Sequence, residues 1–450
     1  MKEINNNKIE KEISKLKNNY KYTWNNEGKK ILLDENKIKL SEEEKKMLEI
    51  LLIQDIPNDL HRNLWIISSG ARMLLKENKN YYKELIKFYE KMENSNHYFY
   101  KYLTRKISLD LNRSSLKKEE TYKLKNILNA FAVRNLSLNY CQGLNLIVAY
   151  LLQMTNYNEE ESFYLFIILM EDILPFDYYY FAIGIEVELS LIKLLFEKFD
   201  NELYTHINEL KAYYFLESKL SMWIISLMLF KTDIKITNIF FDCIFLFCVN
   251  NDNYIFILYT MIFSILAILR NDLLNCKESL DVNDVFDNFM NNPISDENYQ
   301  KIVYYNLISQ DKLKFNDKYI FELRKKKIKQ ISKDKKINFQ FEENIEEVPC
   351  NKFFPLCIKD KKEKPIEEFI VYKSENDLNL YVYNDYFEIK EYKVNNKDEN
   401  KQKINKDIQN CNTNSNEDIK NIEELDKREE DENIYMKNLI IERRKHICKE

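Results

Sequence analysis

Glycine is scarce in this sequence of 450 residues. There are four glycines, Gly28, Gly70, Gly143 and Gly184, and they are scattered rather than clustered. Loops that cradle a phosphate need clustered glycines, because backbone N–H groups must come close to the phosphate oxygens. The sequence therefore excludes a P-loop, a Rossmann fingerprint and a kinase glycine loop.

Metal-ligand patterns are also missing. The four histidines include no H-x-x-x-H pair, and the eight cysteines include no C-x-x-C. Zinc ribbons and thioredoxin-type redox sites depend on such spacings, so we expect no metal and no cofactor of the protein's own. Cysteines such as Cys243 and Cys248, in an apolar run, are typical of a reducing compartment, where they act as small hydrophobic side chains.

Helix-breaking residues are few in the central part of the chain. Between residues 50 and 290 there are two prolines, Pro57 and Pro175. Apolar residues there recur at i, i+3, i+4 and i+7, which marks one buried face of a helix. The sequence predicts an all-α region of two helical subdomains. On the helices that flank residue 142, the predicted core residues are Leu124, Ile127, Leu128, Phe131, Leu144, Ile147, Val148 and Leu151.

Changes in composition divide the chain into four parts. Residues 1–47 are a polar N-terminal extension, and residues 48–335 are the helical domain. Residues 340–395 contain EEFIVYK, LNLYVYN and YFEIKEYKV, whose period-2 alternation predicts a small β meander. Residues 396–450 are polar and charged, which indicates a linker followed by a charged C-terminal helix.

One apolar run raises the question of a membrane. Tyr254–Leu269 is uncharged over sixteen residues, whereas a helix needs about 20 residues to span a bilayer. We interpret it as a buried core helix, and the alternative is an integral membrane protein anchored by this segment. The net charge of −5 does not favour nucleic acid as a partner.

A first polar motif is ISLDLNRSS, which contains Asp110 and Arg113. Three residues apart on a helical turn, these side chains share a face and can pair. The pair would hold the guanidinium in a fixed direction, which matters if it must reach a phosphate. The alternative is an ordinary surface ion pair, which contributes about 0–1 kcal/mol.

A second polar motif contains Gln142 and Gly143. It lies between a helix predicted to end near Arg134 and a helix predicted to begin near Leu144. Gln142 is therefore expected at a helix N-terminus, where partial positive charge favours an anionic ligand. The alternative is a local helix cap. Because glycine is so rare here, Gly143 indicates a backbone need, either unusual dihedral angles or a close approach.

Together these motifs resemble the TBC domain of Rab GTPase-activating proteins. That family carries an opening G-I-P-x-x-x-R-x-x-x-W, then I-x-x-D-x-x-R and Y-x-Q-G, and a later Trp and Asp. The resemblance covers residues 48–335. The matching residues are Ile56, Pro57 and Trp65, then Ile107, Asp110 and Arg113, then Tyr140, Gln142 and Gly143, and finally Trp223 and Asp242.

The sequence departs from the family pattern without altering Arg113 or Gln142. These departures concern local geometry and leave both side chains in place. The residues that differ are Asp55 for the opening glycine, His61 for the arginine (with Arg62 one later), Leu136 for a proline and Leu144 for a methionine.

The resemblance implies catalysis supplied in trans. A Rab that carries GTP and Mg²⁺ hydrolyses its GTP slowly. A TBC protein inserts an arginine and a glutamine into the nucleotide site of the Rab, and these correspond to Arg113 and Gln142. An arginine finger is worth about 10³–10⁵ in rate, which is about 4–7 kcal/mol of barrier. The resemblance gives supporting roles to Asp110, Tyr140, Gly143, Asn145 and Arg134.

The resemblance also implies a partner and a location. The partner is a GTP-bound Rab, the process is vesicle trafficking, and the location is cytoplasmic, at endomembranes through the Rab. The basic segment Phe321–Lys336 could touch an anionic membrane surface. Alternatively it is a solvated helix face with Ile320, Leu323, Ile328 and Ile331 packed inward. A catalytically silent Rab-binding scaffold with the same fold is the alternative to an active GTPase activator.

Overall fold

The computed structural model divides the chain into two compact units, and each is described by itself. The first unit is Met1–Ile331 with Val348–Glu363, and the second is Ser332–Glu347 with Lys364–Glu450. The residues that the structure describes are 22–52, 54, 56–95, 98–111, 114, 116–135, 138, 140–175, 178–179, 183–247, 254–308, 317–334, 370–372, 380–383 and 389–392.

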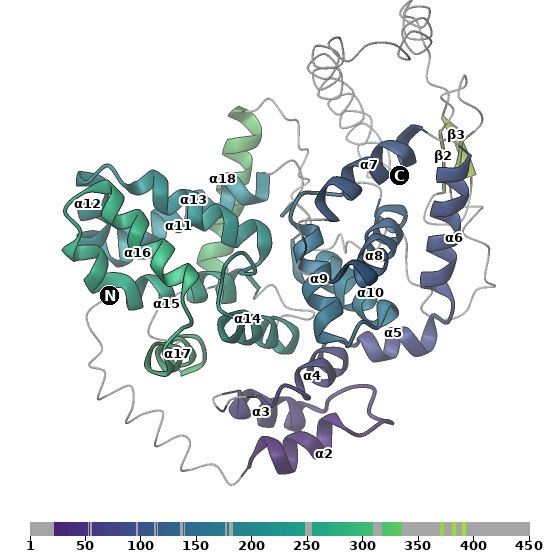
Figure 1. Ribbon diagram of the computed structural model, residues 1–450, viewed down its shortest axis with the longest axis horizontal. Coiled ribbons are helices and arrows are strands. Elements are labelled where there is room, and N and C mark those ends of the chain that lie inside the picture. Colours follow the sequence, from purple (N-terminus) through teal and green to yellow (C-terminus); the bar gives the residue numbers. More distant parts are fainter. Residues whose placement is uncertain are drawn as a thin grey trace, which may run out of the picture. The chain divides into compact units, whose positions relative to one another are not determined.

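The N-terminal helices of the first unit are coloured purple to blue in Figure 1. In chain order they are η1 (Trp24–Gly28), α2 (Lys29–Leu32), α3 (Glu42–Leu51), α4 (His61–Ser68), α5 (Ala71–Glu77), α6 (Tyr81–Asn94), α7 (Tyr98–Leu111), η2 (Lys118–Glu120), α8 (Thr121–Arg134), α9 (Leu144–Met154), α10 (Glu159–Ile168) and η3 (Leu169–Ile173).

The later helices of this unit are coloured teal to green in Figure 1. They are α11 (Ile183–Phe199), α12 (Asn201–Glu209), α13 (Tyr213–Ser226), α14 (Ile234–Phe247), α15 (Tyr254–Asn275), α16 (Ser279–Asn291), α17 (Asp296–Val303), η5 (Tyr304–Ile308) and α18 (Asp317–Asp334). Among the described residues from 22 to 334 no strand occurs. The prediction of an all-α domain is confirmed.

Several of these helices have a polar N-cap residue whose side chain accepts a first-turn N–H. The Ser41 hydroxyl accepts the Glu44 N–H, and the Glu44 carboxylate accepts the Ser41 N–H, which forms a capping box at the start of α3. The Asn158, Asp200 and Ser295 side chains each accept a first-turn N–H at the starts of α10, α12 and α17. Such a cap contributes about 1 kcal/mol to helix stability.

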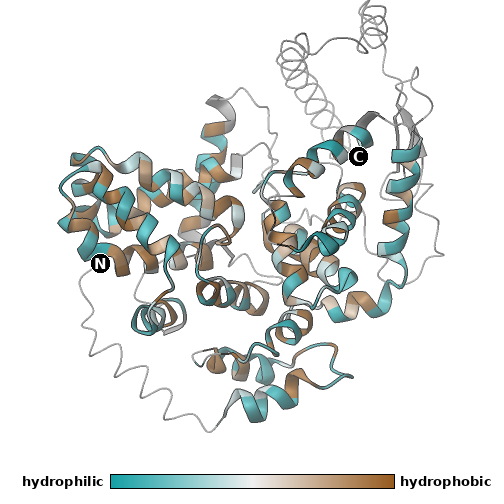
Figure 2. Ribbon diagram, viewed as in Figure 1, coloured by the Kyte–Doolittle hydropathy of each residue, from teal (hydrophilic) through white to brown (hydrophobic). Residues whose placement is uncertain are grey.

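The predicted core lies where the periodicity placed it. All eight predicted core residues of α8 and α9 are at most 1% exposed. These two helices pack against each other, and both pack against α10. Figure 2 shows hydrophobic and hydrophilic residues on different sides of many of these helices. Burial of their apolar faces, at about 25 cal/mol per Å², stabilises the helices on both sides of residue 142.

Helix α4 packs against α14, which joins the N-terminal helices to the later ones. The Trp65 Nε1–H donates to Asp242 Oδ1 at 2.7 Å, and His61 Nδ1 lies 2.8 Å from the same oxygen. All three side chains are buried. Trp65 and Asp242, two residues singled out by the resemblance, thus meet here, and His61 contacts the same carboxylate.

Helix α15 is the apolar segment that raised the membrane question. Phe256–Asn275 is long and apolar enough to cross a membrane, and 67% of its most apolar window is buried inside the protein. A core helix passes the same test of length and composition. Helices α12, α14, α16 and α17 all pack against α15. This packing agrees with the interpretation of the segment as a core helix.

Helix α18 contains most of the basic segment. Ile320, Ile328 and Ile331 are buried, as the inward-packing interpretation predicted, whereas Leu323 is only half-buried. The basic face is interrupted by Arg324, which is buried and donates to Glu188 Oε1 of α11 at 2.7 Å. Arg324 is therefore not part of a solvated basic face, because the Glu188 carboxylate holds it in the core.

Three short strands form in the second unit. β1 (Ile370–Tyr372), β2 (Leu380–Tyr383) and β3 (Ile389–Tyr392) form an antiparallel sheet in the order β1-β2-β3. Residue Ile370 pairs with Val382, and Val382 pairs with Lys390. The strands lie within the three alternating segments of the sequence. The predicted linker and C-terminal helix of residues 396–450, and residues 1–21 of the predicted N-terminal extension, lie outside the described residues.

Candidate functional site

The loop between α8 and α9 places Gln142 at the N-terminus of α9. Helix α8 ends at Arg134 and α9 begins at Leu144, where the sequence predicted both ends. Gln142 is exposed and directly precedes Gly143, the N-cap residue of α9. Its amide group is therefore accessible to another molecule at the helix end that carries partial positive charge.

Gly143 meets both backbone needs that the sequence suggested. Its φ angle is +103°, which side-chain-bearing residues rarely adopt. A Cβ atom at this position would lie 2.7 Å from Ile225 Cγ2 and 3.2 Å from the Ile225 carbonyl oxygen. The turn that carries Gln142 therefore lies directly against the C-terminal end of α13.

The residues on both sides of Gln142 hold the end of α7. The Tyr140 hydroxyl donates to Asp110 Oδ2 at 2.8 Å, and the Asn145 amide donates to the Asp110 carbonyl oxygen at 3.0 Å. Asp110, Tyr140 and Asn145 are all at least 93% buried. Buried hydrogen bonds of this kind fix geometry, since losing one partner leaves the other desolvated. The two sequence motifs are thus joined in space.

Arg113 lies outside the described residues. Helix α7 ends at Leu111, one residue after Asp110, and Ile107 of the same motif is fully buried. The structure thus describes the part of the motif that leads to Arg113. The predicted pairing of Asp110 with Arg113 and the predicted groove shared by Arg113 and Gln142 remain predictions.

Arg134 lies in a buried ion pair at the other end of the loop. Its Nη2 lies 2.6 Å from Glu171 Oε2, its Nε donates to the same carboxylate, and its Nη1 donates to the Tyr81 hydroxyl at 2.7 Å. Burial opposes the charge, but the Glu171 carboxylate outweighs burial and raises the pKa of Arg134 above its usual range. The guanidinium is held inside the protein, so Arg134 supports the loop from α8.

Cys141 lies between Tyr140 and Gln142 and is half-buried. Burial raises the pKa of its thiol, and Lys106 offsets this only in part. The thiol donates a weak hydrogen bond to the Gln142 carbonyl oxygen at 3.6 Å. Cys141 is therefore a protonated thiol that contacts the turn, since reactive cysteines have lowered pKa values.

Comparison with known proteins decides the family. The Rab-GTPase-TBC domain family matches residues 58–274, a range that includes the α7 end, the Gln142 turn and the His61–Asp242 contact. Residues 58–274 belong to the Rab-GTPase-TBC domain family. The family assignment made from the sequence motifs is confirmed.

Individual relatives of the TBC domain are distant. Growth hormone-regulated TBC protein 1 of Homo sapiens is 35% identical over 133 residues, which are 28% of this chain and 36% of that protein. TBC domain-containing protein C4G8.04 of Schizosaccharomyces pombe is 28% identical over 238 residues, which are 51% of this chain and 28% of that protein. The chain thus spans well under half the length of the curated relatives it matches.

A solved structure shares the fold of the TBC domain. It is the Chlamydomonas flagellar RabGAP TBC domain, with a TM-score of 0.50 and 17% sequence identity. The alignment covers 68% of this chain and 96% of that chain. This likeness concerns the fold.

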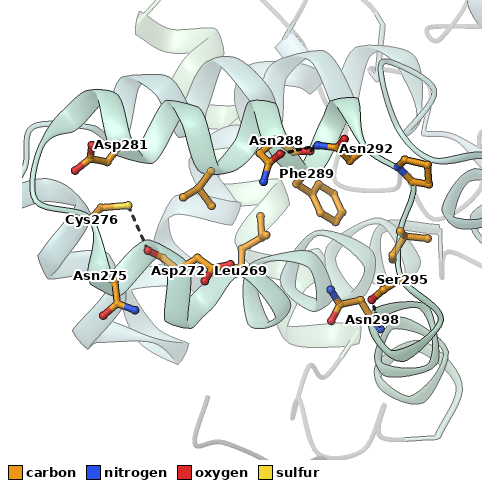
Figure 3. Close-up of a pocket in the computed structure, with 13 residues that line it drawn as sticks. Leu269, Asp272, Asn275, Cys276, Asp281, Asn288, Phe289, Asn292, Ser295 and Asn298 are labelled. Atoms are coloured by element: carbon orange, nitrogen blue, oxygen red, sulfur yellow. Dashed lines mark hydrogen bonds between the residues drawn. The ribbon is translucent and has the colours of Figure 1, made fainter.

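A cavity of 620 Å³ lies between α15, α16 and the start of α17, with most of its lining beyond residue 274. Figure 3 shows Asp272, Asp281 and several asparagine side chains around it. Its lining has no Lys, Arg or His, so it offers a phosphate no cation. Asp281 already accepts the N–H groups of Lys277 and Glu278. The cavity shares no residue with the Gln142 turn.

Metal ligands do not gather in the described part of the TBC domain. Among those residues, no group of three or more His, Cys, Asp or Glu side chains is placed to hold a metal ion.

Sequence reasoning missed three residues around the site. Glu171, on the π-helical turn η3, anchors Arg134, and no spacing in the sequence indicated it. Tyr179 and Ile225 contact each other beside Gly143. A paired tyrosine after a Leu-Pro was visible in the sequence LPFDYY, but its role depends on contacts with a helix more than forty residues later.

Proposed function

We propose that the protein is a GTPase-activating protein for a Rab-family small GTPase, and that Arg113 and Gln142 act in trans. The Rab supplies the GTP and Mg²⁺, so the protein needs no cofactor of its own. Arg113 neutralises the charge that develops on the transferred γ-phosphoryl group. Gln142 orients the attacking water, because its amide both donates and accepts hydrogen bonds.

The observation that carries this proposal is the hydrogen bonding between the two motifs. Tyr140 and Asn145, on either side of Gln142, both hold Asp110. Arg113 follows Asp110 by three residues, so their Cα atoms lie at most about 11 Å apart. This limit on the distance from Asp110 supports the proposal, because a single γ-phosphate requires the arginine and the glutamine to act at one place.

The exposure of Gln142 also supports the proposal. A residue that acts on a nucleotide held by another protein must be accessible, and Gln142 is exposed whereas its neighbours Tyr140 and Gly143 are buried. The contact of Gly143 with Ile225 fixes the backbone from which the Gln142 side chain projects. Pre-organised groups stabilise a transition state without reorganisation at the moment of reaction.

The test is single-turnover phosphate release from a panel of purified GTP-loaded Rabs, with the full-length protein in excess. On the Rab that wild type stimulates, Arg113→Ala should remove most of the acceleration, up to about 10³–10⁵-fold. Arg113→Lys should also fail, because an ammonium lacks the planar fork that bridges phosphate oxygens. Gln142→Ala should lower the rate of phosphate release by as much as Arg113→Ala or by less.

A matched control is available on the same helix. Arg105 is an exposed arginine of α7, and Arg105→Ala should keep the maximal rate within about twofold of wild type. Binding of GTP-loaded Rab should fall much less than turnover in Arg113→Ala, since the contact matters most in the transition state. If wild type binds a GTP-loaded Rab and does not accelerate its hydrolysis, the scaffold alternative replaces the proposal.

The proposed location is cytoplasmic, at endomembranes to which the Rab is attached, in vesicle trafficking. Lys326 and Lys329 of α18 are exposed and could contact an anionic membrane surface. Sedimentation with vesicles that contain phosphatidylserine tests this contact. Binding should fall with added salt, and binding that does not respond to salt would contradict it.

A further inference from the structure

The carbonyl oxygen of Ile225 lies in the last turn of helix α13. Helix α13 ends at Ser226, and the next two residues, Leu227 and Met228, have φ angles of +49° and +63°. The last carbonyls of a helix have no intrahelical partner. The Tyr179 hydroxyl donates to the Ile225 carbonyl oxygen at 2.8 Å. In the part of the chain that the structure describes, no second donor to this oxygen occurs.

The same Ile225 forms the surface under the Gln142 turn. Its Cγ2 and its carbonyl oxygen occupy the space where a Cβ of Gly143 would lie, at 2.7 and 3.2 Å. Any movement of the Ile225 carbonyl therefore changes the support of Gly143 and, through one peptide bond, of Gln142. Tyr179 is 3% exposed, so its ring is held by packing and its hydroxyl has a fixed direction.

We infer that Tyr179 is a positioning residue for Gln142, because its hydroxyl fixes the Ile225 carbonyl against which the Gln142–Gly143 turn rests. Tyr179 itself touches no substrate. The consequence for hydrolysis rests on the proposed function, whereas the ordering of the turn does not depend on it.

Tyr179 also interacts electrostatically with the residue that precedes Gln142. Burial raises the pKa of Tyr179 well above its usual value, and the neighbouring Cys141 thiol adds to this. The hydroxyl therefore remains a protonated donor at neutral pH. Because Cys141 directly precedes Gln142, this interaction adds to the hydrogen bond with Ile225 in placing Tyr179 near the turn.

The chain provides a matched control in the preceding residue. Tyr178 is 1% exposed, and its hydroxyl donates to the Ile224 carbonyl oxygen at 2.8 Å. The Ile224 carbonyl also accepts the Leu227 N–H at 3.3 Å, and the three atoms nearest to a Cβ at Gly143 all belong to Ile225. Tyr178→Phe thus removes a buried hydroxyl from the same helix end without loosening the surface under Gly143.

The first measurement is hydrogen exchange of the peptide that covers residues 141–146 in the full-length protein without a Rab. Tyr179→Phe should speed exchange there by at least about fivefold, since local opening needs less free energy when a supporting contact is lost. Tyr178→Phe should leave this peptide unchanged. Unchanged exchange in Tyr179→Phe would overturn the inference, and so would equal acceleration in Tyr178→Phe.

The second measurement is the maximal single-turnover rate and the half-saturating concentration on a GTP-loaded Rab. Tyr179→Phe should lower the maximal rate by about tenfold, because small displacements of a reacting group are costly, and should leave the half-saturating concentration within about twofold. In a Gln142→Ala background, Tyr179→Phe should cause no further loss, because Tyr179 acts through Gln142.

The outcomes separate the two proposals. If wild type stimulates no Rab but exchange at 141–146 responds to Tyr179→Phe alone, the proposed function fails and the positioning role stands. If wild type is active and Tyr179→Phe lowers the maximal rate by the same factor in the wild-type and Gln142→Ala backgrounds, the positioning role is wrong and the proposed function stands.

Discussion

Gly143→Ala tests how tightly the Gln142 turn is supported. A side chain at a φ of +103° is strained, and such strain costs about 1–3 kcal/mol. The new Cβ would also lie 2.7 Å from Ile225 Cγ2, and overpacking of this kind costs typically about 1–3 kcal/mol more. We expect Gly143→Ala to lower the free energy of unfolding by about 2–6 kcal/mol.

Gly70→Ala separates strain from crowding. Gly70 has a φ of +81°, but a Cβ atom added to it would meet no other heavy atom within 4 Å. Gly70→Ala should therefore lower the free energy of unfolding only by the backbone strain, about 1–2 kcal/mol. The effect of alanine on the unfolded chain is common to both variants and cancels in their comparison. Gly143→Ala should thus cost about 1–3 kcal/mol more than Gly70→Ala.

The assay is urea unfolding of the full-length variants, followed by circular dichroism. A third variant, Ile225→Ala, removes the Cγ2 atom at 2.7 Å from the new Cβ and leaves the carbonyl oxygen at 3.2 Å. In that background, the loss caused by Gly143→Ala should shrink toward the Gly70→Ala value, a coupling of about 0.5–3 kcal/mol. Equal losses for Gly143→Ala and Gly70→Ala, with no coupling to Ile225, would refute the argument that Ile225 supports the turn.

Three further predictions concern buried residues. Phe131→Ala should cost about 3–5 kcal/mol of unfolding free energy, because it empties a large site in the α8 core, and a loss below about 1 kcal/mol in urea unfolding would contradict this. Asp242→Ala should cost about 2–6 kcal/mol, since it leaves two buried donors without their shared acceptor, and Asp242→Asn should cost less by the same assay. Glu171→Gln should destabilise by about 3–5 kcal/mol, because it leaves the Arg134 charge buried and unpaired. The double change that also replaces Arg134 with Met should recover much of that loss in the same urea titration.

The helices could be predicted because their signal is local. The period of the apolar residues gave the ends of α8 and α9 and all eight core residues that flank Gln142. The scarcity of glycine pointed to a backbone need at Gly143, and its φ angle and contact with Ile225 bear this out. Such predictions depend on residues within one or two turns of each other.

The supports of the site could not be predicted because they are long-range. Glu171 meets Arg134 across 37 residues, and Tyr179 meets Ile225 across 46 residues. No periodicity relates such pairs, and helix packing decides which carboxylate or hydroxyl reaches which partner. Spacing alone likewise suggested only Arg113 as a partner of Asp110, whereas the structure gives its carboxylate the Tyr140 hydroxyl.

The most direct test of the central claim is phosphate release from GTP-loaded Rabs under single-turnover conditions, with wild type, Arg113→Lys and Gln142→Ala compared on one stimulated Rab. The account predicts strong acceleration by wild type, loss of most of it in Arg113→Lys, and a substantial loss in Gln142→Ala with Rab binding retained. A rate within about twofold of wild type in Arg113→Lys, on a Rab that wild type clearly stimulates, would contradict the assignment of Arg113.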